Sequence, residues 1–561
     1  MAQSGIQPLP ADVFHLLTEV LAANNEFGTL YNCIVSSKLI ANAGGVNALY
    51  RISHESVVKE GGIESSFADQ KVMTMKWSLM WRTILLSALE KTMYPYCRHL
   101  RMLDLRNLSS LMEHFFDSKN KDKIQKTFFA GDIARFRIVY GKDKGPRLAG
   151  RIDVKQTVLA IGDEIIQQSP MIEGLSEPSG SSIVASVLPT WTARLSHLRE
   201  LELWDGKMLE NEDLRRLINK KCPKLDKLGI FLSTDPDSDQ NLAAFITGMT
   251  ENTLVKFQNI SNSKIGGQTL LALNNHGKSL KQLTLHLDHD GVLALGFLRG
   301  CTSLNKLEIG SSGHDINLKE TENEVFLEMI EWLKFCDLLH TVSISNIASA
   351  PDLLLPVLLN SNVQLETLHI NARDNAMYTV KDHHDFHHAL ATQRTLRDLY
   401  ISADPDPLES RDDIDTLMTT FCSLTNLRKL GLSCISDYFS DEHLKKLAQS
   451  LPHLTDLSIG GYGITDGVLS SIAGLKNLES LAFSGITTFT TGGLLTFIAS
   501  LDDSIKKLAV SVEMADPDTM ISTEDQDLIR ATLASKVMEG TFEYQPLRDP
   551  NVPEFDQSDS E

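Results

Sequence analysis

Apolar residues along most of the chain follow one frame, L-x-x-L-x-L, whose last two apolar positions alternate with other residues. Two clear copies are LRELEL at 198–203 and LTDLSI at 454–459. A period of two places such side chains on one face of a short strand. An amphipathic segment with helical spacing precedes each strand, for example SDEHLKKLAQSL at 440–451. The sequence therefore predicts a repeating unit of one helix and one strand.

This frame recurs fifteen times between about residue 98 and about residue 535, mostly at intervals of 24 to 35 residues. Three copies carry a cysteine ahead of the frame, namely CPKLDKLGI at 222–230, CTSLNKLEI at 301–309 and CDLLHTVSI at 336–344. Other copies begin at Leu198, Leu280, Leu365, Leu396, Leu427, Leu454, Leu478 and Ile505, with looser ones at Leu100, Ile133, Ile172 and Leu254. One strand and one helix cannot bury an apolar face alone, but stacked repeats form a continuous core.

These repeats resemble the leucine-rich repeat family, and in particular its cysteine-containing class, which CPKL at 222–225 and ITDGVL at 464–469 fit. The resemblance implies an α/β fold, a curved solenoid with a parallel sheet on its inner, concave face and helices outside. Cys97, Cys222, Cys301 and Cys336 share one position in the frame. Since thiols a whole repeat apart do not converge on one ion, we predict that they are buried packing residues.

The first 50 residues follow a different pattern. LPADVFHLLTEVL at 9–21 has helical spacing, and its apolar residues cover nearly half of the helix circumference. That arc is wider than one packing interface needs, and Pro10 suits a helix start. After a polar break, residues 30–52 predict two more short helices parted by Gly44 and Gly45. Three short helices lie near the lower size limit of an independent core, so we expect another protein to cover part of the first helix.

This segment resembles the F-box motif, which implies docking onto the Skp-type adaptor of a cullin-RING ubiquitin ligase. The matching positions are Leu9, Pro10, Val13, Leu17, Leu21, Leu30, Val35, Ser36, Leu49 and Tyr50. The sequence departs from the motif in a longer linker between the first two helices and in lacking a tryptophan near its end. The adaptor-binding residues that the resemblance implies are Leu9, Pro10, Val13, Phe14, Leu17, Leu21, Leu30 and Val35.

An alternative role for residues 9–52 is to cap the solenoid, because solenoid ends need closing. However, residues 71–93 already predict a capping helix, whose buried stripe comprises Trp77, Met80, Trp81, Ile84, Leu85 and Leu89. We therefore divide the chain into an F-box unit at 1–53, a linker with the capping helix at 54–97, the solenoid at 98–538 and an acidic tail at 539–561. Prolines and charges favour disorder in that tail, although it could instead fold across the late strands.

In such a solenoid, the residues between the leucines of each strand face the concave side. The client-binding residues predicted on this basis are Arg106, Arg135, Arg137, Trp204, Phe231, His286, Glu308, His369 and Tyr400. The three aromatic residues could anchor a partner or simply pack across strands. The three arginines could form a forked anion site or surface ion pairs.

The net charge of −20 argues against general binding to nucleic acid or anionic membranes. No signal peptide or membrane-spanning stretch is evident, and seven scattered cysteines indicate a reducing compartment, cytosol or nucleus. DHHDFHHAL at 382–390 could clamp a metal through histidines four residues apart, but no third ligand is dictated. The stretch therefore fits a helix start better, and no catalytic motif occurs in a supporting context.

We therefore predict a non-catalytic adaptor without a cofactor, the substrate-recognition subunit of an SCF-type cullin-RING ubiquitin ligase. Its F-box would bind the Skp-type adaptor, and its solenoid would bind an unknown protein client. The alternative is a leucine-rich repeat scaffold or inhibitor that acts by protein binding alone.

Overall fold

The computed structural model describes residues 10–24, 26–51, 67–117, 121–141, 150–180, 183–261, 263–312, 316–371, 379–402, 410–433, 436, 438–460 and 463–547. The chain divides into two compact units, Met1–Ile260 and Ser261–Glu561. Within the described ranges, no helix is long and apolar enough to cross a membrane.

The first unit begins with a group of short helices, as predicted for residues 9–52. They are α1 (Ala11–Ala23), α2 (Phe27–Ser36), α3 (Lys38–Ile40), the π turn η1 (Ala41–Gly45) and α4 (Val46–Arg51). Ala22, Leu30 and Ala48 form their small buried core. The chain bends at Gly44, where φ is 127° and an added Cβ would lie 2.7 Å from Nδ1 of His15. Glycine is therefore required for the close approach of this bend to α1.

The capping helix and the first repeats follow in the same unit. The elements are α5 (Phe67–Ala88), η2 (Tyr96–His99), β1 (Met102–Asp104), α6 (Leu105–Asp117), α7 (Lys121–Phe128), η3 (Gly131–Phe136), α8 (Val154–Gln168), β2 (Gly174–Ser176), α9 (Val184–Trp191), β3 (Glu200–Asp205), η5 (Gly206–Glu210), α10 (Glu212–Lys221), β4 (Lys227–Leu232), α11 (Ser238–Thr247) and β5 (Lys256–Asn259). In α5, the predicted stripe is largely buried, and both Trp77 and Trp81 donate 2.7 Å hydrogen bonds from Nε1 to Oδ1 of Asn107. These bonds fix the capping helix to the first repeat.

The second unit continues the alternation of helix and strand. Its first elements are α12 (Gly267–Leu273), η6 (Asn274–His276), β6 (Gln282–Leu287), α13 (His289–Leu293), η7 (Leu295–Gly300), β7 (Lys306–Ser311), α14 (Leu318–Thr321), α15 (Asn323–Leu333), β8 (Thr341–Ser345), α16 (Ala350–Leu359), β9 (Thr367–Asn371), α17 (His384–Leu390) and β10 (Asp398–Ser402). The later elements are α18 (Arg411–Ser423), β11 (Lys429–Ser433), α19 (Asp441–Ser450), β12 (Asp456–Ile459), β13 (Ile464–Thr465), η8 (Asp466–Val468), α20 (Leu469–Ile472), β14 (Ser480–Phe483), β15 (Thr487–Thr488), α21 (Thr491–Ser500), β16 (Lys507–Ala515), η9 (Pro517–Thr519), α22 (Thr523–Lys536) and β17 (Glu539–Pro546).

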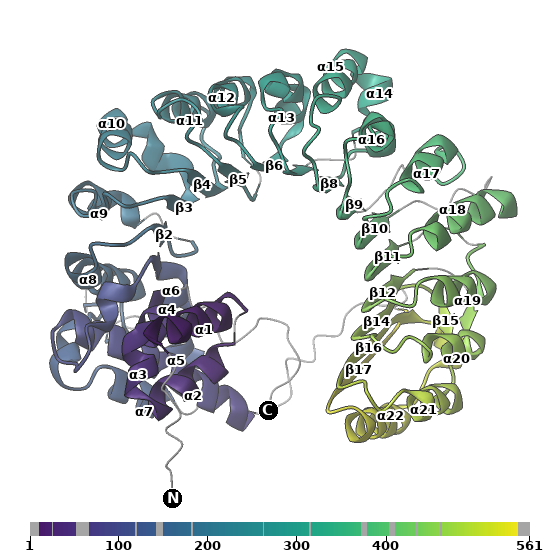
Figure 1. Cartoon of the computed structure of the whole chain (residues 1–561), viewed down its shortest axis with the longest axis horizontal. Coiled ribbons are helices and arrows are strands. Elements are labelled where there is room, and N and C mark those ends of the chain that lie inside the picture. Colours follow the sequence, from purple (N-terminus) through teal and green to yellow (C-terminus); the bar gives the residue numbers. More distant parts are fainter. Residues whose placement is uncertain are drawn as a thin grey trace, which may run out of the picture. The chain divides into compact units, whose positions relative to one another are not determined.

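The main strands of each unit are parallel and pair in chain order. The order is β1-β2-β3-β4-β5 in the first unit and β6-β7-β8-β9-β10-β11-β12-β14-β16-β17 in the second. Equivalent leucines of successive repeats lie opposite each other, as Leu430, Leu457 and Leu481 do, and all three are buried. In each unit the helices that alternate with the strands cover one face of the strands, and among the described residues the opposite face, here called the open sheet face, carries none of them (Figure 1). This arrangement confirms the predicted α/β repeat solenoid.

The repeat cysteines also take the predicted packing role. Cys97, Cys222, Cys301 and Cys336 are each at most 2% exposed and none is in a disulfide. Burial raises the pKa of Cys222 to about 11 and the pKa of Cys301 and Cys336 to about 12. The thiols of Cys222, Cys301 and Cys336 therefore stay protonated and behave as small apolar side chains.

Two predictions about the extent of the repeats are wrong. The loose match at Ile133 is not a strand but the 3-10 helix η3, in which Ile133 and Phe136 are both buried. The sheet also continues into residues assigned to the tail, because β17 pairs with β16 over Glu539–Pro546. The remainder of the predicted tail, from 548 onward, lies outside the described residues.

Candidate functional site

Helix α1 carries two apolar stripes rather than one. Val13, Leu16, Leu17 and Val20 are 41%, 63%, 41% and 55% exposed, and their spacing places them on one side of the helix. The other side turns inward, where Thr18 and Ala22 are buried. The surplus apolar surface predicted for this helix is therefore present.

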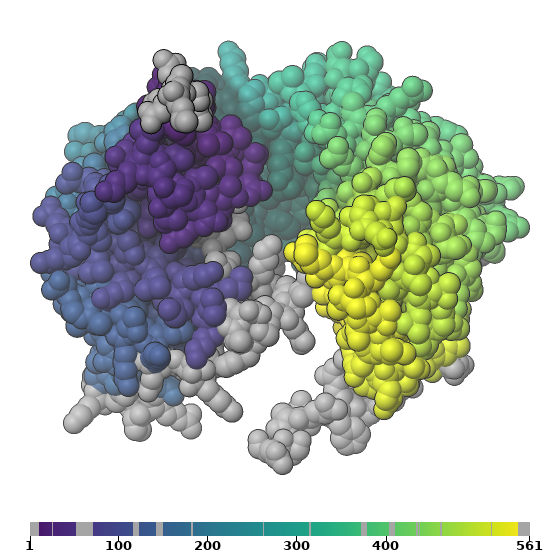
Figure 2. Space-filling model, turned by 60° about the horizontal axis from the view of Figure 1, so that its bottom comes forward, coloured from purple at the N-terminus to yellow at the C-terminus, as the bar shows by residue number. Residues whose placement is uncertain are grey.

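The neighbouring helices α2 and α3, which contact α1, also carry exposed apolar residues. Tyr31 and Val35 of α2 are 56% and 62% exposed, and Leu39 of α3 is 46% exposed. With the outward side of α1 they make up what we call the N-terminal apolar surface: Val13, Leu16, Leu17, Val20, Tyr31, Val35 and Leu39. The helices that carry it, purple in Figure 2, lie at the surface of the molecule. Leu16, Val20 and Tyr31 were not among the predicted adaptor contacts, although the same helical spacing as Val13 and Leu17 could have indicated the first two.

The predicted adaptor contacts divide by burial. Pro10, Val13, Leu17 and Val35 are exposed, whereas Phe14 and Leu21 are half-buried. Leu30 is fully buried, so its predicted contact with an adaptor is wrong. It packs with Ala22 and Ala48, and its contribution is to hold the helices together. Leu9 lies outside the described residues.

Polar and aromatic contacts hold this helical group together and onto the rest of the first unit. Arg51 of α4 makes two hydrogen bonds, of 3.1 and 2.7 Å, to the carboxylate of Glu19 in α1, and these bonds lower the pKa of Glu19. The rings of Tyr50 and Tyr96 lie 4.8 Å apart, joining α4 to η2. Burial raises the pKa of Tyr50 to about 12. These contacts therefore stabilise the helices that carry the exposed apolar residues.

An aromatic platform occupies the open sheet face of the first unit. Trp204 of β3 and Phe231 of β4 are stacked, with ring centroids 4.2 Å apart and an interplanar angle of 12°. Both rings are half-buried and line a cavity of about 150 Å³ together with the exposed Ile260. The two rings therefore pack across neighbouring strands, one of the two predicted alternatives, and remain partly exposed.

A buried glutamate supports this platform from below. Glu177 is 2% exposed, and its carboxylate accepts hydrogen bonds from the backbone N–H groups of Val184 (2.9 Å) and Trp204 (3.0 Å). Burial raises the pKa of Glu177 to about 7. Sequence reasoning missed this residue because it follows a strand of three residues in a weak repeat.

The three predicted arginines do not meet. Arg106 lies in the first turn of α6, reaches Oε2 of Glu202 at 2.7 Å and lines the cavity beside Trp204. Arg135 lies in η3 and pairs with Glu164 of α8 at 2.6 Å, while Arg137 ends the same turn and is exposed. The forked anion site is therefore wrong, and surface ion pairs account for Arg106 and Arg135.

A second, more polar hollow lies on the open sheet face of the second unit. His369 and Tyr400 line it, and its volume is about 420 Å³. Nε2 of His369 lies 3.0 Å from Oδ1 of Asp398, and the His369 ring meets the Tyr400 ring edge-on at 6.2 Å. An added Cβ at Gly431 would lie 2.3 Å from the Tyr400 ring, so this glycine makes room for the tyrosine.

The other two predicted client contacts lie on neighbouring strands. His286 is half-buried on β6, against Gly310 of β7. Glu308 accepts hydrogen bonds from Lys306 (2.9 Å) and Thr284 (2.7 Å). Burial raises the pKa of Glu308, but these bonds outweigh burial and leave it below the ordinary value. Glu308 is thus already paired within the sheet.

The histidine cluster at 383–388 packs between helices. His384 lies 2.8 Å from Asp413 of α18, and His383 lies 3.7 Å from Asp352 of α16. His387 is fully buried, and burial lowers its pKa to about 3. No group of three potential ligands that could hold a metal ion occurs among the described residues. The stretch begins helix α17, as predicted, and these contacts link α17 to the helices of the neighbouring repeats.

No known family profile matches the chain, and no curated protein matches it either. Among solved structures, it is similar at 14% identity to an internalin from Listeria monocytogenes, over 67% of this chain and 88% of that one, with a TM-score of 0.32. It is also similar at 14% identity to Rad7 in its complex with Elc1 from yeast, over 82% and 97% of the chains, with a TM-score of 0.37. Likenesses this distant carry no inference about function. The repeat geometry itself defines the class, a leucine-rich repeat solenoid.

Proposed function

We propose that the chain is a substrate-recognition subunit of an SCF-type ubiquitin ligase, in which the N-terminal apolar surface binds a Skp-type adaptor and the open sheet face binds a protein client. The observation that carries the proposal is the exposed apolar side of α1, at positions that resemble the F-box motif. The chain itself would perform no chemistry. Its contribution would be proximity, because tethering a client beside the ligase raises their effective concentration.

The area of the N-terminal apolar surface determines how many of its residues an adaptor has to contact. Covering four half-exposed aliphatic side chains of α1 contributes on the order of 4 kcal/mol. Association costs about 4 to 15 kcal/mol in lost motional freedom. The outward side of α1 alone therefore does not suffice, and we expect Tyr31 and Val35 of α2 to lie in the same interface.

The client would be held by protein contacts on the open sheet face. Trp204 and Phe231 offer a rigid apolar platform, and aromatic side chains of this kind are frequent anchors of protein interfaces. The second unit offers a more polar surface for client contacts, which is lined by His369, Asp398 and Tyr400. Either surface could bind a client segment without the other.

Co-purification tests the ligase assignment. We expect a Skp-type adaptor to co-purify with the full chain and to be lost with Leu17→Asp, because a carboxylate there would be desolvated in the interface. The matched control is Leu271→Asp, since Leu271 of α12 is 55% exposed in the second unit. Pro10→Ala should weaken recovery less, because Pro10 only favours the helix start. Equal adaptor recovery from Leu17→Asp and the wild type would leave a leucine-rich repeat scaffold as the better description.

Proximity labelling with the proteasome blocked tests the client surface. Trp204→Ser and Tyr400→Ser should each reduce labelling of clients while the melting temperature stays close to that of the wild type. Phe335→Ser is the matched control, because Phe335 is 65% exposed and lies away from the strands, directly after α15. Labelling that falls only in proportion to melting temperature would contradict a client site on the open sheet face.

A further inference from the structure

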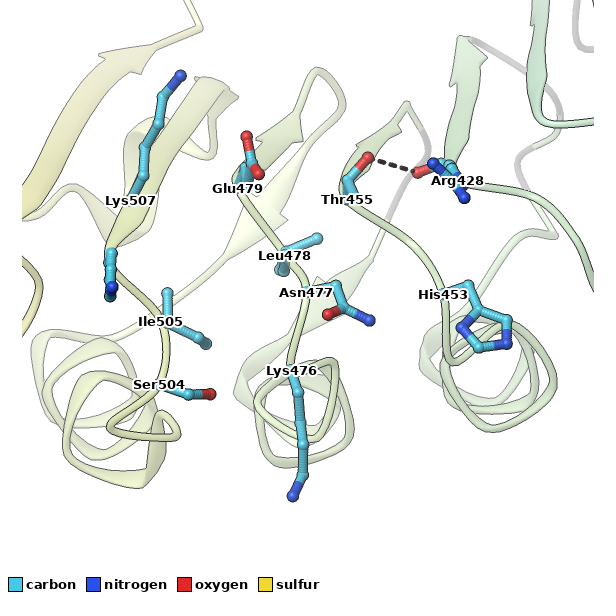
Figure 3. A pocket seen from close by; sticks show the side chains of 11 residues that line it. Arg428, His453, Thr455, Lys476, Asn477, Leu478, Glu479, Ser504, Ile505 and Lys507 are labelled. Carbon is cyan, nitrogen blue, oxygen red and sulfur yellow. Dashed lines mark hydrogen bonds between the residues drawn. The ribbon is translucent and has the colours of Figure 1, made fainter. Parts of the chain in front are cut away.

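A groove in the second unit lies where β11, β12, β14 and β16 begin, and its lining includes none of the residues predicted to bind a client. Its volume is about 500 Å³. The turns that lead from the helices into these strands form its wall, as Figure 3 shows. Its lining includes Arg428, His453, Lys476, Asn477, Lys506 and Lys507.

The lining of this groove is basic, in contrast to a chain with a net charge of −20. Arg428, Lys506 and Lys507 are exposed, and none of the three has an ion-pair partner among the described residues. Lys476 pairs with Asp502 at 3.4 Å. Glu479 is the acidic residue of the lining. Three unpaired cations around one hollow leave a local excess of positive charge.

The groove also offers neutral hydrogen-bond donors. The buried side chains of Leu478 and Ile505 line the middle of the groove, next to the exposed Asn477 and Ser504. In Figure 3 the side chains of Lys476 and Lys507 point in opposite directions, Lys507 on the side of the strands and Lys476 on the side of the helices. Carboxylates accept hydrogen bonds from ammonium, guanidinium, amide and hydroxyl groups. The donors are therefore spread along the groove rather than gathered at one point.

We propose that this groove binds a short acidic segment of a partner protein, with carboxylate or phosphate groups meeting Arg428, Lys506 and Lys507. A nucleic acid fits less well, because its charges are evenly and closely spaced and need a long basic surface. Here Glu479 interrupts the cations, and the rest of the chain is strongly acidic. The inference does not rest on the ligase assignment, since it concerns only the second unit.

Fluorescence anisotropy with the full chain tests this proposal. The probe is a fluorescein-labelled peptide of six glutamates flanked by glycine and serine. We expect saturable binding that Lys506→Gln/Lys507→Gln weakens roughly 10-fold and Arg428→Gln roughly 3-fold, as for exposed ion pairs. Raising the salt from 0.05 to 0.5 M should weaken binding further, since the Debye length shortens.

Two matched variants distinguish binding in the groove from nonspecific electrostatic attraction of the peptide. Lys220→Gln/Lys221→Gln removes two exposed lysines of α10 in the first unit and should leave peptide affinity unchanged. Asp502→Asn should tighten binding roughly 3-fold, because it releases Lys476 while its amide oxygen can still accept the N–H of Ser504. Absence of peptide binding, equal losses in the two lysine double variants, or tighter binding of a ten-nucleotide single-stranded RNA would each overturn the proposal.

Discussion

Helices α1 (13 residues) and α19 (10 residues) are both amphipathic, but they use their apolar residues differently. α19 buries Leu444, Leu447 and Ala448 against neighbouring repeats and exposes charged residues on its other side. α1 buries only Thr18 and Ala22 and exposes an aliphatic stripe. A helix inside a stacked array has neighbours to cover its apolar side, whereas α1 lies before the array. The apolar side of α1 is therefore left uncovered by its own chain, which is the basis for proposing a partner there.

The largest expected effect on stability comes from a substitution on the buried side of α19. Leu447 is 0% exposed, so Leu447→Ala should lower the free energy of unfolding by about 3 kcal/mol through lost burial and a residual cavity. Urea denaturation followed by circular dichroism measures this change. A loss below about 1 kcal/mol would show that α19 is not held as tightly as its burial indicates.

A second effect follows from the buried side of α17. Burial, and then the charges of nearby histidines, lower the pKa of His387 to about 3. The unfolded chain takes up this proton near pH 6.5, so stability is complete above that pH and is lost as the pH falls toward 3. Between pH 7 and 5 the loss should be on the order of 2 kcal/mol, measured as a shift of the urea midpoint.

The matched variant for this pH effect is His387→Gln, which cannot take up the proton. Its stability should change less between pH 7 and 5 than that of the wild type, whatever its stability at pH 7. An identical pH dependence in the two proteins would mean that other groups, such as His443, cause the acid sensitivity.

The smallest expected effect on stability comes from a substitution on the exposed side of α1. Leu17→Ala makes the same chemical change as Leu447→Ala, but Leu17 is 41% exposed. Its cost in stability should therefore stay within about 0.5 kcal/mol, measured by the same urea titration. Equal costs at the two positions would break the comparison, because Leu17 would then be packed within its own chain.

The fold was largely predictable because the L-x-x-L-x-L frame encodes both burial and strand direction. The prediction failed at Ile133, where the first half of the frame also fits a 3-10 turn. Residues three apart lie on the same side of such a turn, so Ile133 and Phe136 are buried without a strand. The prediction that Arg106 lies on a strand failed for a related reason, since it lies in helix α6. Oδ1 of Asp104 accepts the backbone N–H of Arg106 at 2.9 Å, and the first strand gives way to a helix.

The candidate sites were only partly predictable. Spacing on α1 was enough to find Val13 and Leu17, and the L-x-L rule was enough to place Trp204 and Phe231 on the open sheet face. The partners of these residues come from the neighbouring repeat, as with Glu177, which accepts the backbone N–H of Trp204, and no local pattern encodes that contact. The groove around Lys507 was missed because its residues lie in the turns before the frame and at its first x-x positions, whereas the prediction used only the positions around L-x-L.

Calorimetric titration of the purified full chain with a purified Skp-type adaptor tests the central claim most directly. The account predicts one-to-one binding with a negative change in heat capacity, because apolar surface is buried, and a loss of at least roughly 10-fold in affinity for Leu17→Asp. Leu271→Asp should bind as the wild type does. Absence of binding, or equal affinity and heat capacity change in Leu17→Asp and the wild type, would contradict the claim that the N-terminal apolar surface is the adaptor site.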